Sequence, residues 1–319
     1  MNLRPAKLTN LRGILTMTRV LVADALEESA VKKIKDAGLE VVIRNKETDG
    51  PIEEQIKGFD CIVVRSATKV TKEVLESADE LKLVVRAGVG LDNVDQDAAK
   101  EKGVKVMNTP EAPTVSVAEM VLSLMFAISR QITAADSSMK DEKWEKKKLQ
   151  GTELWQKTLG VIGLGRIGYE TAKRAKALDM KVLAYDVIDI DSACKELGVE
   201  RTDFDTLIKS SDYISLHVPL LPQTKGMIGT KELDAMKETA YLINTARGGV
   251  VDEAALLKAL DEGKIAGAAL DVFEKEPLED WSIAKHPKVI ATPHVSSSTN
   301  EAQIRVGDLT ADKVIAEFK

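Results

Sequence analysis

A strand, a glycine-rich turn and a helix near the middle of the chain constrain the fold more than any other feature. The apolar run Leu159–Ile162 predicts a strand buried on both faces, and residues 169–178 predict a helix. The turn between them contains three glycines in G-x-G-x-x-G spacing, namely Gly163, Gly165 and Gly168. The first permits a tight turn, the second lets a pyrophosphate approach the backbone, and the third lets the helix pack close to the strand. The sequence therefore predicts a parallel α/β sheet that binds a dinucleotide at this turn.

An acidic residue stands where such a unit needs one. Residues 182–185 predict a second strand that ends in Asp186, and its separation from Gly165 is 186 − 165 = 21 residues. A carboxylate at this distance accepts a hydrogen bond from an adenosine ribose and would repel a 2′-phosphate. The neighbours Val187 and Ile188 offer no cation to receive such a phosphate. We therefore expect NAD rather than NADP.

Strands and helices alternate on both sides of this unit, which indicates parallel sheets covered by helices on both faces. Earlier strands are expected at residues 19–24, 39–43, 60–64, 83–85 and 104–106. Later strands are expected at residues 213–217, 240–244, 266–270 and 289–291, with a final helix over about 299–318. No G-x-G-x-x-G opens the first series, so that part is expected to do something other than bind the cofactor. The predicted fold class is α/β, with two tandem doubly wound parallel-sheet domains.

The segment between the two series predicts a hinge followed by a helix. Residues 108–114 contain two prolines. One long helix is expected from Thr114 to about Lys140, with Ser116 and Glu119 forming a capping box near its start. The middle of this helix, residues 119–129, is apolar nearly all round and must be buried on more than one side. The residues alone leave two interpretations open, a central core helix or the interface of a homodimer.

The overall composition argues against several other classes of protein. The chain has 319 residues, enough for two domains, and its formal net charge of −6 gives no basic footprint for nucleic acid. Cys61 and Cys194 form no metal or redox motif, so we expect no metal and a cytoplasmic location. The longest apolar run, Met120–Ile128, is far too short to span a membrane. Residues 1–18 match a transit peptide poorly, and a plain leader is expected before a core that starts near Met17.

Four reactive side chains follow predicted strands in the second domain: Arg247, Asp271, Glu276 and His294. Ligands of an open α/β sheet bind beyond the carboxyl ends of its strands. Hydride transfer needs a proton carrier at the substrate oxygen, and an imidazole titrates near neutral pH. A carboxylate on its other ring nitrogen would fix the tautomer, and a guanidinium could bind a substrate carboxylate in two bonds. The set predicts oxidation of a 2-hydroxy acid or reduction of a 2-oxo acid.

Placement alone leaves two of these assignments open. His217 also ends a predicted strand, so His294 has a competitor as the proton carrier. Glu274 lies two positions before Glu276, and the spacing does not choose between the two acids.

Several blocks resemble the D-isomer-specific 2-hydroxyacid dehydrogenase family: GLGRIG at 163–168, NTARGGVVDEAALLKALDEGKIAGAALDVFEKEP at 244–277 and TPH at 292–294. Three further blocks are most similar to the members that oxidise 3-phospho-D-glycerate: RAGVGLDNVD at 86–95, MNTP at 107–110 and SMKDEKWEKKKLQGTEL at 138–154. The likeness extends from about Arg19 to Phe318. It implies a flavodoxin-like substrate-binding domain over 1–114, completed by the C-terminal helix 299–319, and a Rossmann NAD-binding domain over 115–298. It also implies that the domains close about the hinge.

The resemblance implies a role for individual residues. Arg247 would bind the substrate carboxylate, His294 would be the acid/base, and Glu276 its acid partner, which chooses Glu276 over Glu274. The implied NAD-binding set is Gly163, Gly165, Arg166, Ile167, Gly168, Asp186, Thr245 and Asp271, with Asp271 facing the nicotinamide amide. The implied substrate-binding set is Arg65, Arg86, Gly88 and Val89, with the arginines receiving a phosphate. The long helix would form a homodimer interface, and Lys146 and Lys147 could reach the partner's substrate.

The expected reaction is NAD-dependent oxidation of 3-phospho-D-glycerate to 3-phosphohydroxypyruvate, the entry to serine biosynthesis. The alternatives are a glyoxylate or hydroxypyruvate reductase of the same family, and a non-catalytic, NAD-sensing protein like the family's corepressors. The chain departs from the family pattern at Ser296, where a glycine is usual, so that a Cβ and a hydroxyl are added near the nicotinamide. It also ends at Lys319 without the carboxy-terminal regulatory domains of many members, as expected of a short form or a truncation.

Overall fold

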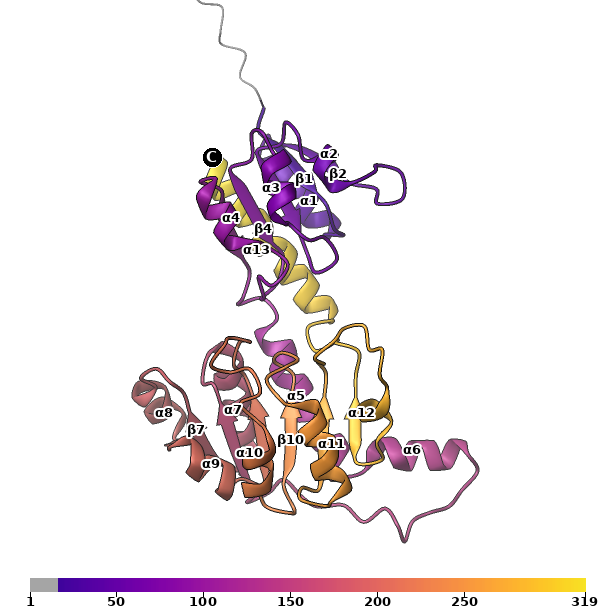
Figure 1. Ribbon diagram of the computed structural model, residues 1–319. Helices are drawn as coiled ribbons and strands as arrows, with labels where there is room; N and C mark the ends of the chain where they lie inside the picture. The colour runs from indigo at the N-terminus through magenta and orange to yellow at the C-terminus, as the bar shows by residue number, and fades with distance from the viewer. Residues whose placement is uncertain (1–16) are drawn as a thin grey trace, which may run out of the picture. The chain divides into compact units, whose positions relative to one another are not determined.

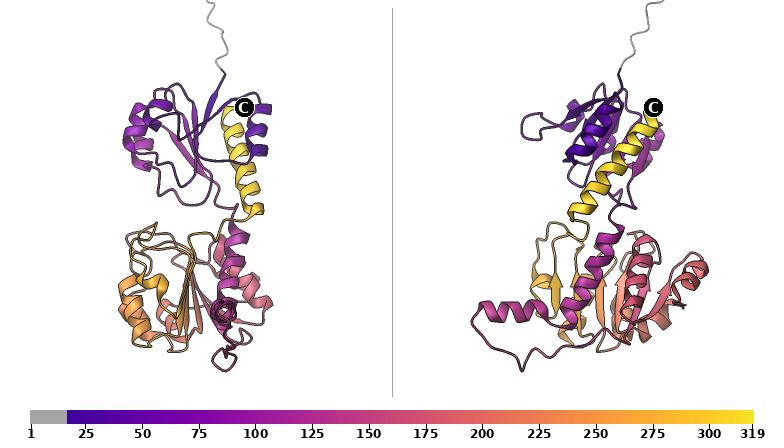
Figure 2. Two further views of the ribbon diagram at one scale, coloured as in Figure 1. Left: turned by 90° about the vertical axis from the view of Figure 1, so that its right-hand side faces the viewer. Right: turned by 180° about the vertical axis from the view of Figure 1, so that it is seen from behind.

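The computed structural model describes residues 17–319, which divide into two compact units (Figures 1 and 2). The first unit runs to Ala112 and is completed by Gln303–Lys319, and the second comprises Pro113–Ala302. Each unit contains a parallel sheet, so the predicted α/β class with two parallel-sheet domains is confirmed. The leader expected over residues 1–18 lies outside the described residues except for its last two positions.

The first unit is built on a five-stranded sheet in the order β2-β1-β3-β4-β5, in which all neighbours are parallel. Alternate residues of β1 point to opposite faces, as in any strand. Val20 and Val22 share a core with α1 and α13, whereas Leu21 shares a core with α3 and α4. The final helix thus packs on the sheet of the first unit. The elements are β1 (Arg19–Val22), α1 (Glu28–Asp36), β2 (Glu40–Ile43), α2 (Ile52–Gln55), β3 (Cys61–Val64), α3 (Lys72–Ser77), β4 (Leu83–Arg86), α4 (Gln96–Glu101), β5 (Lys105–Asn108) and α13 (Asn300–Phe318).

The second unit is built on a seven-stranded parallel sheet in the order β12-β11-β10-β9-β6-β7-β8. One face carries a core shared with α5, α7 and α8, and the other a core shared with α9, α10 and α11 (Figures 1 and 2). The strand order reverses between β6 and β9, which is the point where ligands of such sheets bind. The elements are α5 (Thr114–Ser129), α6 (Ile132–Lys140), β6 (Thr158–Ile162), α7 (Arg166–Ala177), β7 (Lys181–Tyr185), α8 (Asp191–Leu197), β8 (Glu200–Arg201), α9 (Phe204–Ser210), β9 (Tyr213–Leu216), α10 (Thr230–Ala235), β10 (Tyr241–Asn244), α11 (Glu253–Asp261), β11 (Gly267–Leu270), α12 (Ser282–Lys285) and β12 (Val289–Ala291).

The prediction of a single helix from Thr114 to Lys140 is wrong. The segment forms two helices, α5 and α6, and the chain bends by 62° between them. Gln131 lies between them in the left-handed region, with φ of 51°. The carbonyl of Ser129, in the last turn of α5, accepts a hydrogen bond from the returning Thr152 amide at 2.9 Å. The Gln131 side chain also donates to the Gln150 carbonyl at 2.9 Å. The segment that returns toward β6 therefore caps α5 and diverts the chain.

The expected capping box is also wrong, because Ser116 lies inside α5. Its hydroxyl shares a hydrogen bond with the Thr299 hydroxyl at 2.7 Å, and Glu119 lies 3.8 Å from the Arg174 guanidinium. Among residues 17–319 no single helix is long and apolar enough to cross a membrane, and α5 with α6 meets that test only as a bent pair.

Candidate active site

The glycine turn of the second unit has the geometry that each glycine was expected to provide. Gly163 has φ of +94°, and a Cβ there would lie 2.8 Å from the His217 carbonyl oxygen of the strand end beside it. A Cβ on Gly168 would lie 2.0 Å from the Gly163 carbonyl oxygen, so α7 packs directly on the turn. A Cβ on Gly165 would meet nothing within 4 Å. The helix begins at Arg166, three residues earlier than predicted, with Gly165 as its N-cap.

Asp186 lies beside this turn at the end of β7. Its carboxylate accepts from the Leu164 amide at 2.8 Å and from the Ile188 amide at 3.3 Å. A carboxylate has about four acceptor sites, which leaves room for ribose hydroxyls. The turn, the open Gly165 and the half-buried Asp186 together fit the adenosine and pyrophosphate of NAD.

Exposed apolar side chains flank the same edge of the sheet and were not singled out from the sequence. Val187 and Ile188 after β7 are 87% and 62% exposed, and Leu220 and Leu221 beyond β9 are 39% and 49% exposed. Their position beyond the ends of the two strands that flank β6 suits contact with an adenine ring. The signal available in the sequence was an apolar pair within a few residues of the end of each strand.

Thr245 gives a second test of fit to a cofactor. Its Oγ1 atom is buried and has no hydrogen-bond partner among the described residues, although buried hydroxyls are normally paired. The loop that carries it is shaped by Asn244, which accepts from the Ala246 amide at 3.0 Å and donates to the Arg247 carbonyl at 3.0 Å. An orphaned hydroxyl in a firmly held strand-end loop is consistent with a bound ligand as its partner.

His294 and Glu276 form a close pair, although 18 positions separate them in the sequence. The His294 Nδ1 atom lies 2.6 Å from Glu276 Oε2, and the other carboxylate oxygen accepts from the Phe273 amide at 3.0 Å. The hydrogen bond to Glu276 raises the pKa of His294 above its ordinary value, although burial opposes it. Burial raises the pKa of Glu276. The hydrogen bonds from His294 and Phe273 lower this pKa by a larger amount, so the net change is downward. The arrangement favours an imidazolium held against a carboxylate.

Arg247 belongs to the same cluster. Its charge lowers the pKa of both His294 and Glu276. Its loop is brought there by Gly248, since a Cβ on that residue would lie 1.7 Å from the Phe273 carbonyl oxygen. Gly248 is therefore pressed against the segment that carries Glu276.

Asp271 is fully buried at the end of β11 and binds the segment around His294. Its Oδ1 accepts from the Thr292 hydroxyl at 2.5 Å and the Val295 amide at 2.9 Å. Its Oδ2 accepts from both the amide, at 2.8 Å, and the hydroxyl of Ser296. His294 itself has φ of 53°, which costs about 1–3 kcal/mol for a residue with a side chain. Asp271 therefore fixes both sides of this strained histidine, and Ser296 supplies a hydroxyl that glycine would not.

The competing histidine and acid have different surroundings. Burial lowers the pKa of His217 to about 3, and its Nε2 atom shares a hydrogen bond with the Ser215 hydroxyl at 2.9 Å. An imidazole with so low a pKa accepts a proton too weakly to be an effective proton carrier. Glu274 instead accepts from the Glu253 amide at 3.1 Å, and its own amide donates to the Glu253 carboxylate at 2.6 Å. Geometry thus separates the alternatives that spacing left open.

The substrate residues expected in the first unit lie at the carboxyl edge of its sheet. Arg65 follows β3, and Arg86 is the last residue of β4, beside it. Gly88 has φ of +147°, and a Cβ there would overlap the Arg86 guanidinium, so a larger residue would displace that side chain. The Val89 carbonyl accepts from the Asn108 amide group at 2.5 Å. Each unit therefore gathers its own part of the predicted residues at one sheet edge.

Comparison with known proteins identifies the family. Residues 122–296 match the family model described as D-isomer specific 2-hydroxyacid dehydrogenase, NAD binding domain. D-3-phosphoglycerate dehydrogenase of Archaeoglobus fulgidus is 47% identical over 93% of this chain, which spans only 56% of that relative. Hydroxypyruvate reductase of Thermotoga maritima is 47% identical, over 94% of this chain and 98% of the relative.

Solved structures agree with the sequence comparisons. D-lactate dehydrogenase from Aquifex aeolicus, complexed with NAD and lactic acid, matches with a TM-score of 0.81 and 33% identity over 94% of this chain and 95% of that one. The second unit accordingly contains the family's NAD-binding domain. The chain belongs to the D-isomer specific 2-hydroxyacid dehydrogenase family.

Proposed function

We propose that the protein oxidises 3-phospho-D-glycerate to 3-phosphohydroxypyruvate with NAD, as the entry step to serine biosynthesis. The observation that carries the dehydrogenase chemistry is the cluster of His294, Glu276 and Arg247 at the carboxyl edge of the sheet that also bears the glycine turn. We assign NAD binding to the second unit and binding of the substrate phosphate to the first. Relatives named D-3-phosphoglycerate dehydrogenase, at 43–47% identity, support the choice of substrate.

Each member of the cluster has one task in this proposal. Bound NAD supplies the hydride acceptor. His294 takes the proton from the substrate hydroxyl through Nε2, because Nδ1 faces Glu276. Glu276 stabilises the imidazolium that results, and Arg247 binds the substrate carboxylate. In the reverse direction the imidazolium returns the proton to the carbonyl oxygen.

The basic character of one edge of the first unit supports a phosphorylated substrate. Lys46, Arg65 and Arg86 follow or end β2, β3 and β4, whose carboxyl ends share that edge because the strands are parallel. Guanidinium groups bind phosphate through two bonds, and a lysine adds a further charge. A glycerate without phosphate would not need several cations.

The test compares initial rates for three substrates at equal protein concentration. NADH formation with 3-phospho-D-glycerate is measured against NADH consumption with hydroxypyruvate and with glyoxylate. We expect kcat/KM for the phosphorylated acid to exceed that for the others. Rapid turnover of hydroxypyruvate without use of the phosphorylated acid would overturn the substrate assignment, and NAD binding without any turnover would support a sensor.

A hydroxypyruvate reductase is the second candidate because one observation favours it. The Thermotoga maritima relative of that name has nearly the same length as the matched region, since 98% of it is covered. The rate comparison above decides between the two substrates directly.

We further propose a cytoplasmic homodimer assembled through α5 and α6. In Figure 1, α6 and the loop after it extend away from the sheet of the second unit. Apolar residues are unusually exposed along this region: Phe126 at 43%, Ile132 at 54%, Met139 at 56%, Trp144 at 80% and Trp155 at 60%. Such exposure on neighbouring elements is typical of a protein interface.

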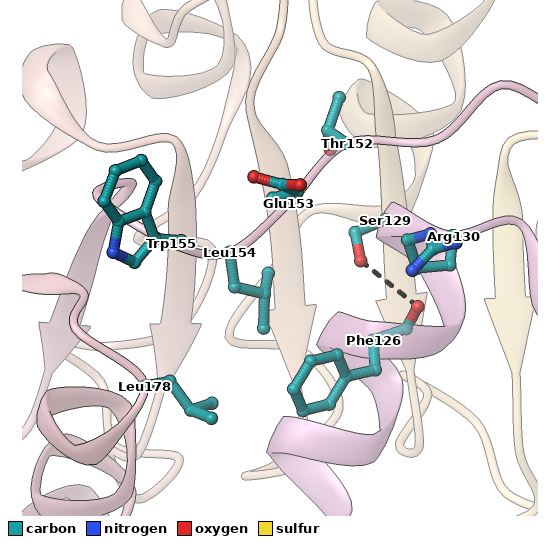
Figure 3. A pocket seen from close by; sticks show the side chains of 8 residues that line it. All are labelled: Phe126, Ser129, Arg130, Thr152, Glu153, Leu154, Trp155 and Leu178. Carbon is teal, nitrogen blue, oxygen red and sulfur yellow. Dashed lines mark hydrogen bonds between the residues drawn. The ribbon is translucent and has the colours of Figure 1, made fainter.

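A pocket of about 400 Å³ lies at the end of α5 and would be part of that interface. Figure 3 shows Phe126, Leu154 and Leu178 lining it, with Trp155 at its side. It contains none of the candidate active-site residues. Sedimentation of the wild-type chain should give a dimer, and Phe126→Asp should shift it toward monomer; a monomeric wild type at micromolar concentration would contradict the proposal.

A further inference from the structure

The loop that carries Arg65 is held by a buried carboxylate from another strand. Asp24, just after β1, is 7% exposed. Its Oδ2 atom accepts from the Arg65 amide at 2.6 Å and from the Thr68 amide at 3.1 Å. Its Oδ1 atom accepts from the Thr68 hydroxyl at 2.7 Å. One side chain thus binds both the first and the last residue of the loop 65–68, more than 40 positions away in the sequence.

Asn93 binds the other side of the same two residues. Its Nδ2 group donates to the Arg65 carbonyl and to the Thr68 carbonyl, each at 2.6 Å. The amide and the carbonyl of both end residues are therefore satisfied by two side chains, so neither end of the loop is free to shift. Between these ends, Ser66 and Ala67 are exposed at the tip.

Lys46 supports the carboxylate from a third loop. Its Nζ atom lies 2.5 Å from Asp24 Oδ1. Burial raises the pKa of Asp24, but the bonds from Lys46, Arg65 and Thr68 outweigh it and bring the pKa below the ordinary value. The carboxylate therefore stays ionised, and a charged acceptor binds amide donors more strongly than a neutral one.

We propose that Asp24 and Asn93 are positioning residues, which hold the loop 65–68 in the conformation that presents Arg65 to the anionic group of the substrate. The inference rests on the proposed function, because it assigns Arg65 to the substrate. The physical reason is preorganisation: a loop that is ordered before binding loses less conformational entropy when the anion arrives. Neither residue needs to touch the substrate.

The first unit offers a matched control for a purely structural effect. Asp60 is also a buried carboxylate, at 9% exposure, and it also accepts from a backbone amide, that of Arg19 at 2.9 Å, and from a lysine, Lys82 at 2.8 Å. It precedes β3, whereas Arg65 follows that strand, so Asp60 lies at the opposite edge of the sheet. Substitution of either aspartate removes a bond to a backbone amide and one to a lysine, but only Asp24 is connected to the loop.

The experiment compares Asp24→Ala, Asn93→Ala and Asp60→Ala with the wild type in the full chain. For the first two we expect KM for 3-phospho-D-glycerate to rise at least about tenfold, the factor that about 1.4 kcal/mol of lost binding gives. kcat should fall less than KM rises, and the Kd for NADH, measured by fluorescence, should stay unchanged. Asp60→Ala should lower Tm without changing KM.

Two results would overturn the inference: an unchanged KM in folded Asp24→Ala and Asn93→Ala, or an equal rise of KM in Asp60→Ala. If Asp24→Ala does not fold, Asp24→Asn and Asn93→Ala carry the same test with smaller changes. A wild type that prefers an unphosphorylated acid would refute the proposed substrate, and the variants would then be compared on that acid. The wild type therefore tests the proposed substrate, and the variants test the positioning role separately.

Discussion

Replacing Glu276 by glutamine removes one charge from the His294 pair with almost no change of shape. In the wild type one carboxylate oxygen accepts from the Phe273 amide and the other faces His294 Nδ1. Glutamine has a single oxygen, so it can serve only one of these two donors. Either the backbone bond or the bond to the imidazole is lost, and the imidazolium loses its counter-charge in both cases.

The size of the effect follows from the geometry. A hydrogen bond to a charged group contributes about 1.5–3 kcal/mol, and the separation of 2.6 Å is short for such a bond. The side chains of His294 and Glu276 are 46% and 35% exposed, so solvent screening favours the lower end of that range. Since about 1.4 kcal/mol corresponds to a factor of ten in rate, Glu276→Gln should lower kcat roughly tenfold.

The pH profile gives the sharper assay. His294 must be neutral to accept the hydroxyl proton, so the rate of oxidation rises as pH passes through its pKa. Glu276 raises that pKa, and Glu276→Gln should therefore move the acidic limb of kcat/KM to lower pH. Glu274→Gln is the matched control, because Glu274 binds the Glu253 amide instead. An unmoved limb in Glu276→Gln, or an equal shift in Glu274→Gln, would refute the assignment.

The remaining predictions concern the proton carrier, the cofactor turn, cofactor choice and stability. His294→Ala should lower kcat by about 10² to 10⁴ while the Kd for NAD is nearly unchanged, and turnover that survives would exclude His294 as the carrier. Gly165→Ala should weaken NAD binding with little change in Tm, whereas Gly168→Ala should lower Tm because its Cβ would overlap the Gly163 carbonyl; the reverse pattern would contradict the reading of the turn. Asp186→Ser should reduce the ratio of NAD to NADP affinity, and an unchanged ratio would remove Asp186 from cofactor choice. Chemical denaturation should show that the pair stabilises the fold most between about pH 4.5 and 6.5: the Glu276 contribution is lost as pH falls through its lowered pKa, and the His294 contribution as pH rises through its raised pKa. If the free energy of unfolding differs between wild type and Glu276→Gln by the same amount at every pH, this prediction is wrong.

The strands were predictable because both sheets are parallel and buried. Strands covered on two faces consist of continuous apolar runs, such as Cys61–Val64 and Tyr213–Leu216, and these are easy to recognise. The shorter elements α8, β8, α10 and α12 were missed because few of their residues are buried and their pattern is weak. Burial made the central strands easy to recognise, but the edge strands β2, β5 and β12 were also expected although none of their residues is fully buried.

The end of α5 could not be predicted because its cause is distant in the sequence. Nothing in the residues at 130–131 marks a stop, since neither glycine nor proline occurs there. The helix ends because the Ser129 carbonyl is taken by the Thr152 amide and Gln131 turns to bind Gln150. A local pattern records the preference of a segment for a helix, but it cannot record a competing donor that returns 23 positions later, as Thr152 does after Ser129 (152 − 129 = 23).

The same limitation applies to the candidate site, where the strand-end rule selected candidate residues but could not show what holds them. His217 and His294 satisfy that rule equally, and only burial separates a histidine whose pKa falls to about 3 from one whose pKa is raised. Asp271 is an example of a residue that holds a candidate site residue through bonds that the sequence does not reveal. A carboxylate with both oxygens occupied by the segment 292–296 can offset the strain of a left-handed His294. The precision of the histidine then depends on a buried acid that need not take part in proton transfer, and this dependence exists only in three dimensions.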